Sequence, residues 1–319
     1  MKLIVQIPCY NEEHTLPATV ADIPRQIPGI DKVEVLIIDD GSRDRTVEVA
    51  REIGVDHIVV NKRNMGLARS FRRGLDACLA LGADIVVNTD GDNQYSGADI
   101  AKLVQPILEG KVDIVVGDRQ TGAIDHFSPS KKALQRFGSW VVRSFSGVNV
   151  PDAVSGFRAI SRDAAMRLNI VSSFSYTIEM LIQVGMKGIA FTSVPIATNA
   201  KTRESRLFKN AFRFIERSAT TLLRMYAMYR PLRVFTLIGL IIAIIGTIPM
   251  IRFFYFYLFV SGHGKIQSLI IGSALLTIGV LTFLLGMVAD LLNHNRQLIE
   301  ITLEKVRKME NLLAEEGRG

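Results

Sequence analysis

Short runs of β-branched and other apolar residues alternate with longer stretches of helical spacing along the first half of the chain. The runs have the length of buried strands, and the stretches place apolar residues three or four positions apart, as amphipathic helices do. The predicted strands are Leu3–Ile7, Val33–Ile38, His57–Val60, Ile85–Val87 and Asp113–Val116. The predicted helices are Glu12–Ile23, Thr46–Ile53, Leu67–Leu81 and Asp99–Leu108. This alternation predicts an α/β fold with a mainly parallel sheet and helices on both faces.

The pattern changes in the second half. A basic amphipathic stretch is typical of helices that lie at a membrane surface, and two apolar segments follow it, Phe235–Ile251 and Ile266–Ala289. Each segment is close to the roughly 20 residues that cross a bilayer. The sequence therefore predicts four parts. They are a domain at 1–204, amphipathic juxtamembrane helices at 205–233, a two-helix transmembrane hairpin at 234–292 and a C-terminal helix at 293–319.

The charge distribution agrees with a membrane-attached protein. The chain of 319 residues has a net charge of +7, although only Arg252 and Lys265 are charged between Val234 and Ala289. A basic protein favours acidic partners such as phosphates, anionic lipids or nucleic acid. Because the basic residues flank the apolar segments, lipid headgroups explain them better than nucleic acid does, and both chain ends are expected in the cytosol.

Several classes of protein are disfavoured by missing motifs. Cys9 and Cys78 are too few for a disulfide framework and fit a reduced compartment. The chain has no Gly-x-Gly-x-x-Gly after its first strand, no phosphate-binding loop with Gly-Lys-Ser/Thr and no Gly-x-Ser-x-Gly. Its five histidines lack metal-ligand spacing. These absences argue against a dinucleotide cofactor, a P-loop ATPase, a serine hydrolase and a zinc site.

Polar clusters fall at the ends of the predicted strands. They are Pro8–Glu12, Asp39–Ser42, Asp90–Asp92 and Gly117–Arg119. Any one of them is explained by turn chemistry, since Asp, Asn and Gly favour turns. Four clusters along the carboxyl edge of one sheet predict a ligand-binding site instead.

Asp90-Gly91-Asp92 carries the most specific chemistry in these clusters. Two carboxylates one residue apart at a strand end can share a hard divalent cation with a diphosphate. Such an ion offsets the charge of a departing nucleotide. Gly91 leaves room for a ligand to approach the backbone. A turn or helix-capping role for Asp40, in the neighbouring acidic cluster, is the alternative to a binding role.

The chain resembles family 2 glycosyltransferases of the polyprenyl-phosphate type, a group that includes dolichol-phosphate mannose synthases and bacterial undecaprenyl-phosphate glycosyltransferases. Six motifs carry the resemblance, in the family's order and spacing. They are Ile7–Glu12, Ile38–Ser42, Asn64–Gly66, Asp90–Gln94, Gly117–Arg119 and Asp152–Arg158. The resemblance implies a glycosyltransferase type A (Rossmann-like) domain. It also implies a nucleotide sugar as donor, with Mg²⁺ or Mn²⁺ as cofactor.

The resemblance further assigns residues to the donor and the metal. The implied nucleotide-sugar contacts are Pro8, Tyr10, Glu12, Ile38, Asp40, Asp90, Gly91, Asp92 and Gln94, of which Asp90, Asp92 and Gln94 would surround the metal ion. Asp152 lies just before Ser155–Arg158, a motif beside the family's reacting centre. Its expected roles are a general base, a residue that orients the acceptor or a partner of Arg158.

The acceptor assignment also has a physical basis. A polyprenyl phosphate is already anionic near neutral pH, so it needs positive charge at the site more than a strong base. The candidate cations are Arg119, Lys131, Lys132, Arg203 and Arg206. Arg119 matches the family's acceptor-phosphate arginine. The family pattern Arg-x-x-Gly-x-Ser-Lys is here Ala200–Arg206, so Ala200 replaces the arginine and Arg206 replaces the lysine.

The leading hypothesis is an inverting, metal-dependent transfer of one sugar, from GDP-mannose or a UDP-hexose, to polyprenyl or dolichyl phosphate. The enzyme would be a multi-pass protein of the cell membrane with its catalytic domain, which carries Asp92, Asp152 and Arg119, on the cytosolic face. Its transmembrane and C-terminal helices are the expected place of any homo-oligomer contact. The alternatives are a processive polysaccharide synthase, against which the missing Gln-x-x-Arg-Trp motif speaks, and a non-catalytic nucleotide-sugar-binding protein.

Overall fold

The computed structural model describes residues 1–120, 143, 147–171, 176–199, 220, 226–260 and 265–316. The chain divides into two compact units. Met1–Leu222 and Thr302–Gly319 form the first, here called the α/β unit, and Leu223–Ile301 forms the second, called the hairpin unit. The predicted boundaries at 204, 233 and 292 remain predictions.

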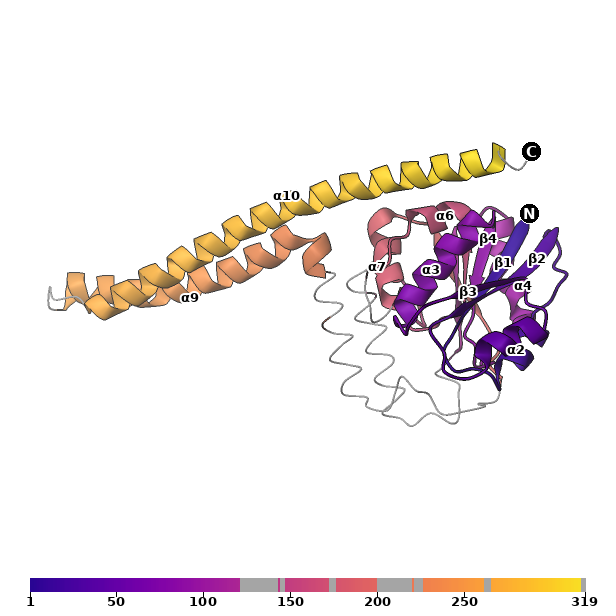
Figure 1. Ribbon diagram of the computed structural model, residues 1–319. Coiled ribbons are helices and arrows are strands. Elements are labelled where there is room, and N and C mark those ends of the chain that lie inside the picture. The colour runs from indigo at the N-terminus through magenta and orange to yellow at the C-terminus, as the bar shows by residue number, and fades with distance from the viewer. Residues whose placement is uncertain are drawn as a thin grey trace. The chain divides into compact units, whose positions relative to one another are not determined.

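A seven-stranded sheet forms the centre of the α/β unit, in the order β3-β2-β1-β4-β6-β5-β7 (Figure 1). Its strands are β1 (Lys2–Cys9), β2 (Lys32–Asp39), β3 (His57–Val60), β4 (Ile85–Asn88), β5 (Ile114–Asp118), β6 (Arg158–Ser161) and β7 (Phe191–Pro195). Strand β6 runs antiparallel to its neighbours β4 and β5, and the other pairs are parallel. The predicted α/β fold with a mainly parallel sheet is thus confirmed, with β6 and β7 added after residue 157.

Helices cover both faces of this sheet, as the pattern predicts. The α/β unit contains α1 (Leu16–Ala21), α2 (Thr46–Glu52), α3 (Leu67–Ala80), η1 (Gly97–Asp99), α4 (Ile100–Leu108), α6 (Arg162–Arg167) and α7 (Tyr176–Lys187). Helix α1 begins four residues later than the expected start at Glu12. The reason is local: Asn11 has a left-handed φ of 54°, and residues 12–15 form a turn that precedes the helix.

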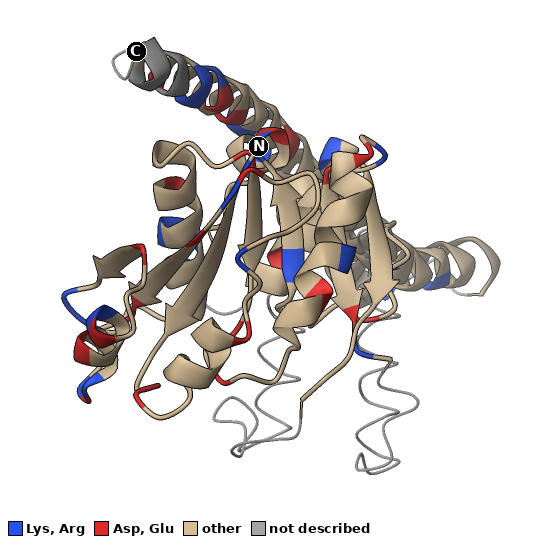
Figure 2. Cartoon of the chain, turned by 90° about the vertical axis from the view of Figure 1, so that its right-hand side faces the viewer, with Lys and Arg blue, Asp and Glu red and all other residues tan. Residues whose placement is uncertain are grey.

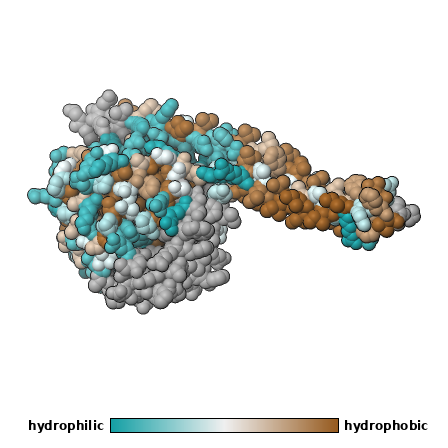
Figure 3. All heavy atoms as spheres, turned by 180° about the vertical axis from the view of Figure 1, so that it is seen from behind, coloured by the Kyte–Doolittle hydropathy of each residue, from teal (hydrophilic) through white to brown (hydrophobic). Residues whose placement is uncertain are grey.

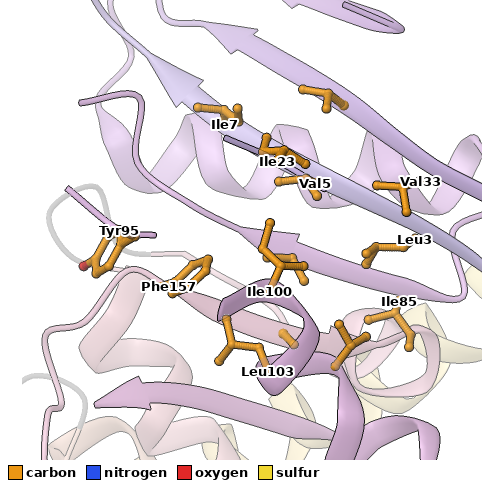
Figure 4. Packing of buried hydrophobic residues seen from close by; sticks show 14 of the residues in the cluster. Leu3, Val5, Ile7, Ile23, Val33, Ile85, Tyr95, Ile100, Leu103 and Phe157 are labelled. Atoms are coloured by element: carbon orange, nitrogen blue, oxygen red, sulfur yellow. The ribbon is translucent and has the colours of Figure 1, made fainter. Parts of the chain in front are cut away.

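Alternate side chains of the strands pack on opposite layers of helices. Leu3, Val5 and Ile7 of β1 join a core that also contains residues of α1, α2 and α4 (Figure 4). Gln6 belongs to the opposite face, where a Cβ added to Gly74 of α3 would lie 2.5 Å from its Oε1. Both faces of the central strands are therefore buried, which explains why they read as almost continuous apolar runs.

The last turns of the chain belong to the α/β unit. They form the end of α10 (Ile266–Glu316), which is one continuous helix. The boundary that the sequence predicts near residue 292 falls within this helix. Arg307 donates from Nη1 to the carbonyl oxygens of Met166 and Leu168, at 3.0 and 3.2 Å, and from Nη2 to Asp76, at 3.2 Å. The guanidinium thus caps the end of α6, where the helix leaves carbonyl groups without partners.

Helix α9 (Pro231–Phe259) and the first part of α10 form the hairpin unit. Both helices are long and apolar enough to cross a membrane, by length and composition, and the hydrophobic surface of Figure 3 covers them. Figure 2 shows their charged residues to be few, in contrast to the α/β unit. Helix α9 continues past Arg252 through the aromatic residues 253–257.

Glycines set the packing of these two helices. Gly239 and Gly246 of α9 are seven residues apart, as are Gly272 and Gly279 of α10. A Cβ added to Gly239 would lie 2.7 Å from the carbonyl oxygen of Gly279, and one added to Gly272 would lie 2.7 Å from that of Gly246. The two backbones are in contact at both pairs, which is the close approach that small residues allow between membrane helices.

A charged cluster lies at the amino edge of the sheet, opposite the carboxyl edge. Glu34 of β2 is only 4% exposed, and its carboxylate lies within bonding distance of two lysines and a histidine. Lys2 Nζ lies at 2.7 Å, Lys32 Nζ at 2.6 Å and His57 Nε2 at 2.7 Å from its carboxylate. Burial alone would raise the pKa of Glu34, but these partners outweigh burial and lower the pKa from 4.5 to about 2.

We expect the substitution Gly279→Val to destabilise the hairpin by about 1–3 kcal/mol, because its side chain would overlap the backbone of α9. The matched control is Ala274→Val, which adds volume at an exposed position of the same helix. Thermal unfolding of the full chain in mild detergent, followed by circular dichroism, measures both. Equal melting temperatures for the two variants would contradict contact between the glycine backbones.

Glu34 gives a pH-dependent stability of defined sign. Because its pKa is lower in the folded chain, its contribution is complete above pH 4.5 and disappears as the pH falls toward 2. The shift corresponds to on the order of 3 kcal/mol. The melting temperature of Glu34→Gln should therefore lie below that of the wild type at pH 6 and approach it near pH 2. Glu48→Gln, at an exposed position of α2, is the control and should follow the wild type at both pH values.

Candidate active site

Four polar loops meet at the carboxyl edge of the sheet, as the sequence predicts. Residues 10–12 follow β1, residues 40–42 follow β2, residues 89–94 follow β4 and Arg119 follows β5. A fifth loop, residues 152–157, reaches the same edge because it precedes the antiparallel strand β6. The site is therefore built from four parallel strand ends and one reversed strand.

The first two loops hold each other. The backbone N–H of Asn11 donates to Ser42 Oγ at 2.9 Å, and that of Glu12 donates to Thr46 Oγ1 at 2.8 Å. Asn11 Oδ1 accepts from the backbone N–H of Arg43 at 2.8 Å. Three residues of this region are assigned to the nucleotide sugar. Pro8 lies in β1, one residue before its end, Tyr10 is partly exposed and Glu12 is buried. The bonds of Asn11 and Glu12 fix the backbone that follows Tyr10.

Asp40 and Ile38 are more internal than a simple ligand contact requires. Asp40 Oδ1 accepts from Asn61 Nδ2 at 2.8 Å and from the Met65 N–H at 2.9 Å, while Oδ2 accepts from the Gly66 N–H at 2.9 Å. Asp40 therefore positions the loop that begins α3. It does not cap the next helix along the chain, since the N-cap residue of α2 is Arg45. Ile38 is fully buried, and its Cδ1 would lie 2.7 Å from a Cβ added to Gly74.

The acidic loop after β4 is tied at several points. Gln94 Nε2 donates to Asp92 Oδ2 at 2.7 Å. Thr15, directly before α1, and Thr19 of α1 donate to the carbonyl oxygen of Gly91 at 2.8 and 3.2 Å. A Cβ at Gly91 would lie 3.1 Å from Cys9 Sγ, so the loop packs closely on β1. Burial raises the pKa of the Cys9 thiol well above its usual value, and this cysteine therefore stays a neutral packing group.

The donor set of this loop fits a cation shared with a substrate. Asp90 and Asp92 are two partly exposed carboxylates, and Gln94 adds an amide. Within the described ranges, no three His, Cys, Asp or Glu side chains converge as a complete metal cage. Mg²⁺ is commonly held by one or two carboxylates together with phosphate oxygens. The residues present fit that mode of binding.

Arg119 and Asp152 form a bidentate ion pair beside this loop. Arg119 Nε lies 2.7 Å from Asp152 Oδ2, and Nη2 lies 3.0 Å from Oδ1. Asp152 is 1% exposed, whereas the arginine side chain keeps 21% of its surface. Burial works against the charge of Arg119, but Tyr95, Asp152 and Asp90 outweigh burial and raise its pKa. The arginine therefore stays charged, and none of the described residues binds its Nη1.

Three polar residues that the sequence reasoning missed hold Gly156, in the loop that follows Asp152, next to Asp90. Asn88 Nδ2 donates to the carbonyl oxygen of Gly156 at 2.8 Å and to Tyr176 Oη at 2.9 Å, and the Gly156 N–H donates to Tyr95 Oη at 3.0 Å. A Cβ at Gly156 would lie 3.1 Å from both carboxylate oxygens of Asp90. Burial raises the pKa of Tyr95 to about 12, so its hydroxyl remains protonated.

The signal for these residues is weak in the sequence. Asn88 is a polar residue at the end of an apolar strand, and the tyrosines resemble ordinary core aromatics. Tyr95 stacks on Phe157 and Tyr176 stacks on Phe71, with ring centroids 5.1 and 4.0 Å apart.

The chain returns to the acidic loop before the basic segment. The backbone N–H of Asn199 donates to the Gln94 carbonyl oxygen at 2.9 Å, and its Nδ2 donates to the Asn93 carbonyl oxygen at 3.1 Å. The acceptor candidates Lys131, Lys132, Arg203 and Arg206 lie outside the described residues, as does most of the amphipathic segment. The structure thus brings together Asp90, Asp92, Gln94, Arg119 and Asp152, and it leaves the other cations unplaced.

Relatives of known name match between 61% and 64% of the chain. A dolichyl-phosphate hexose transferase of Haloferax volcanii is 30% identical over 64% of this chain and 86% of its own length. An undecaprenyl-phosphate mannosyltransferase of Micrococcus luteus is 27% identical over 61% of this chain and 83% of its own. A polyprenol monophosphomannose synthase of Mycolicibacterium smegmatis is 24% identical over 61% and 76%, respectively.

Solved structures share the fold. Glucosyl-3-phosphoglycerate synthase of Mycobacterium tuberculosis, in complex with Mn²⁺, UDP and glucosyl-3-phosphoglycerate, superposes with a TM-score of 0.53 at 21% identity. The match covers 71% of this chain and 78% of that one. A complex of the same enzyme with Mg²⁺ and UDP gives 0.51 at 20% identity over 71% and 78%. The α/β unit therefore has the glycosyltransferase type A fold.

The family model for glycosyl transferase family 2 matches residues 4–168, just over half of the chain. That range contains all five loops of the candidate site. The resemblance inferred from the motifs is confirmed, and the chain belongs to glycosyl transferase family 2.

Proposed function

We propose that this glycosyltransferase moves one sugar from a nucleotide-diphosphate sugar to a polyprenyl phosphate, with inversion at the anomeric carbon. The observation that carries the proposal is the adjacency of two groups at one sheet edge. The Asp90–Gln94 loop is suited to a cation and a diphosphate, and beside it Arg119, which Asp152 holds through Nε and Nη2, has an Nη1 to which no described residue binds. The names of the relatives support a polyprenyl-phosphate acceptor.

The charges account for both substrates. Asp90, Asp92 and Gln94 would hold Mg²⁺ or Mn²⁺, which supplies positive charge to the diphosphate as it leaves. Arg119 is held from one side by Asp152, so its Nη1 edge is suited to bind a phosphate oxygen of the acceptor. Lys131, Arg203 and Arg206 are proposed as further contacts for that phosphate. The donor is GDP-mannose or a UDP-hexose, and the nucleoside would lie over the loops after β1 and β2.

The reaction needs no strong base. An oxygen of the acceptor phosphate attacks the anomeric carbon, a new carbon–oxygen bond forms, and the bond to the nucleotide diphosphate breaks with its electron pair on the leaving oxygen. The attacking oxygen is already anionic near neutral pH. Both oxygens of Asp152 are bonded to Arg119, which favours an orienting role for Asp152 over that of a base.

The hairpin unit fits a lipid-linked acceptor. A polyprenyl phosphate keeps its reactive group in the headgroup layer, so its enzyme has to work at a membrane surface. Two helices of sufficient length and apolarity supply the anchor. We propose a multi-pass membrane protein with the α/β unit and both chain ends on the cytosolic side.

Removing either carboxylate of the acidic loop should abolish transfer. We expect Asp90→Asn and Asp92→Asn to lower the rate by about a hundredfold or more, because the diphosphate loses its counter-charge. The control is Asp31→Asn, an exposed position at the far edge of the sheet. Purified full-length chain is incubated with a panel of radiolabelled nucleotide sugars and a polyprenyl phosphate, and the label in the extracted lipid is counted. Labelled lipid formed without divalent cations, or at the wild-type rate by either variant, would contradict the proposal.

Gly156 should tolerate no side chain. The methyl group of Gly156→Ala would lie 3.0 Å from Tyr176 Oη and 3.1 Å from both oxygens of Asp90. We expect a higher Mg²⁺ concentration for half-maximal rate and about a tenfold lower rate. Gly54→Ala is the matched control. Its φ of +67° strains the new residue, so the variant tests general destabilisation, but nothing lies within 4 Å of the added carbon. If both variants lose activity equally, general destabilisation explains the effect and contact with Asp90 does not.

A further inference from the structure

Arg158 heads the largest side chains that are completely buried among the residues that the structure describes. It begins β6 and pairs with Asn88 of β4 and Val116 of β5, at the carboxyl edge of both. Among the described residues, no carboxylate lies within ion-pair distance of its guanidinium. Burial lowers the pKa of Arg158, yet an arginine remains protonated in proteins. The interior therefore contains a full positive charge without a direct counter-ion.

The guanidinium is held by neutral acceptors instead. Nε donates to the Ser155 carbonyl oxygen at 2.9 Å, and Nη2 donates to that of Ala153 at 3.0 Å. Nη1 donates to the carbonyl oxygen of Thr177 in α7 and to Met180 Sδ, both at 3.0 Å. Two of these bonds fasten the turn that follows Asp152, and the other two fasten that turn to α7.

A purely structural role does not explain the charge. Burying an uncompensated ion is costly, and apolar residues of similar volume often fill such sites at no loss of stability. An uncharged side chain would pack in this position without desolvating a guanidinium. The charge of Arg158 therefore indicates a role in the neighbouring active site.

We propose that Arg158 is a positioning residue for the acceptor phosphate. It fixes the turn from which Asp152 holds Arg119, and it adds an uncancelled positive charge behind that ion pair. Arg119, Asp152 and Arg158 together carry one net positive charge beside the acidic loop. The inference rests on the proposed function, since it assigns this charge to the anionic acceptor.

The experiment compares two substitutions in the full-length chain. Arg158→Met removes the charge and keeps much of the volume, and Arg158→Lys keeps the charge but loses the forked hydrogen bonds. The matched control is Arg167→Met, another arginine that donates to a carbonyl oxygen, that of Lys187, in the same unit. Melting temperature, donor Kd and the Kd of a short-chain prenyl phosphate are measured by calorimetry, and rates are measured with varied polyprenyl phosphate.

We expect folded Arg158→Met to bind the prenyl phosphate at least about tenfold more weakly, with a donor Kd within about threefold of the wild type. Arg158→Lys should recover part of the acceptor binding, and Arg167→Met should match the wild type. Unchanged acceptor binding, or an equal loss of donor binding, overturns the proposal. If both substitutions at 158 unfold the chain, the residue is structural and the proposal also fails. A wild-type chain that binds no prenyl phosphate would contradict the proposed acceptor itself, which is a separate result.

Discussion

The reversed direction of β6 is the constraint on which the site depends. A parallel strand in this position would begin at the amino edge, far from the loops that follow β4 and β5. Because β6 is antiparallel, the loop before it arrives at the carboxyl edge between Asn88 and Val116. Asp152 can then reach Arg119, and Gly156 can face Asp90. One reversed strand thus joins the acidic loop after β4 to the arginine after β5.

The site contains opposite charges at short range, and hydrogen bonds hold these charges in place before a substrate binds. Arg119 is held by Asp152, Asp92 by Gln94, and Asp40 by the backbone of the loop that begins α3. Dipoles and charges fixed in advance stabilise charge that develops during a reaction without having to reorganise. The tyrosines do not add further charge, because burial keeps the hydroxyl of Tyr95 protonated. The arrangement suits a reaction in which negative charge passes from one phosphate to another.

The sequence predicts β1, β2, β4 and β5 well because both faces of each are buried, so that β-branched runs such as Leu3–Ile7 are unbroken. The short run of β3 is predicted although it is only partly buried. Strand β6 escapes prediction because it is only four residues long and begins with the charged Arg158, so it gives no apolar run of the usual length. The motifs correctly bring Asp90, Asp92 and Arg119 to one edge. They do not reveal that Asp40 accepts hydrogen bonds from the amides of Met65 and Gly66. Nor do they reveal that Asp152 forms an ion pair with Arg119. These contacts join segments about 25 to 33 residues apart, which motif spacing does not bring together. The role of Gly239 and Gly279 in the close packing of α9 and α10 is visible only once the two helices are paired in the structure.

The chain ends add an argument about topology that hydropathy alone cannot make. The hairpin unit lies in the sequence between two parts of the α/β unit, because Thr302–Gly319 belongs with Met1–Leu222. Arg307 secures that last part by binding the carbonyl groups at the end of α6 and the carboxylate of Asp76. A hairpin that is inserted into one folded unit has to leave and return on the same side of a membrane. Two crossings satisfy this requirement, whereas one or three would place parts of a single hydrogen-bonded unit on opposite sides. The two apolar helices among the described residues and the bonds of Arg307 are thus compatible with the topology proposed above, in which the chain leaves and re-enters the α/β unit on one side of a membrane.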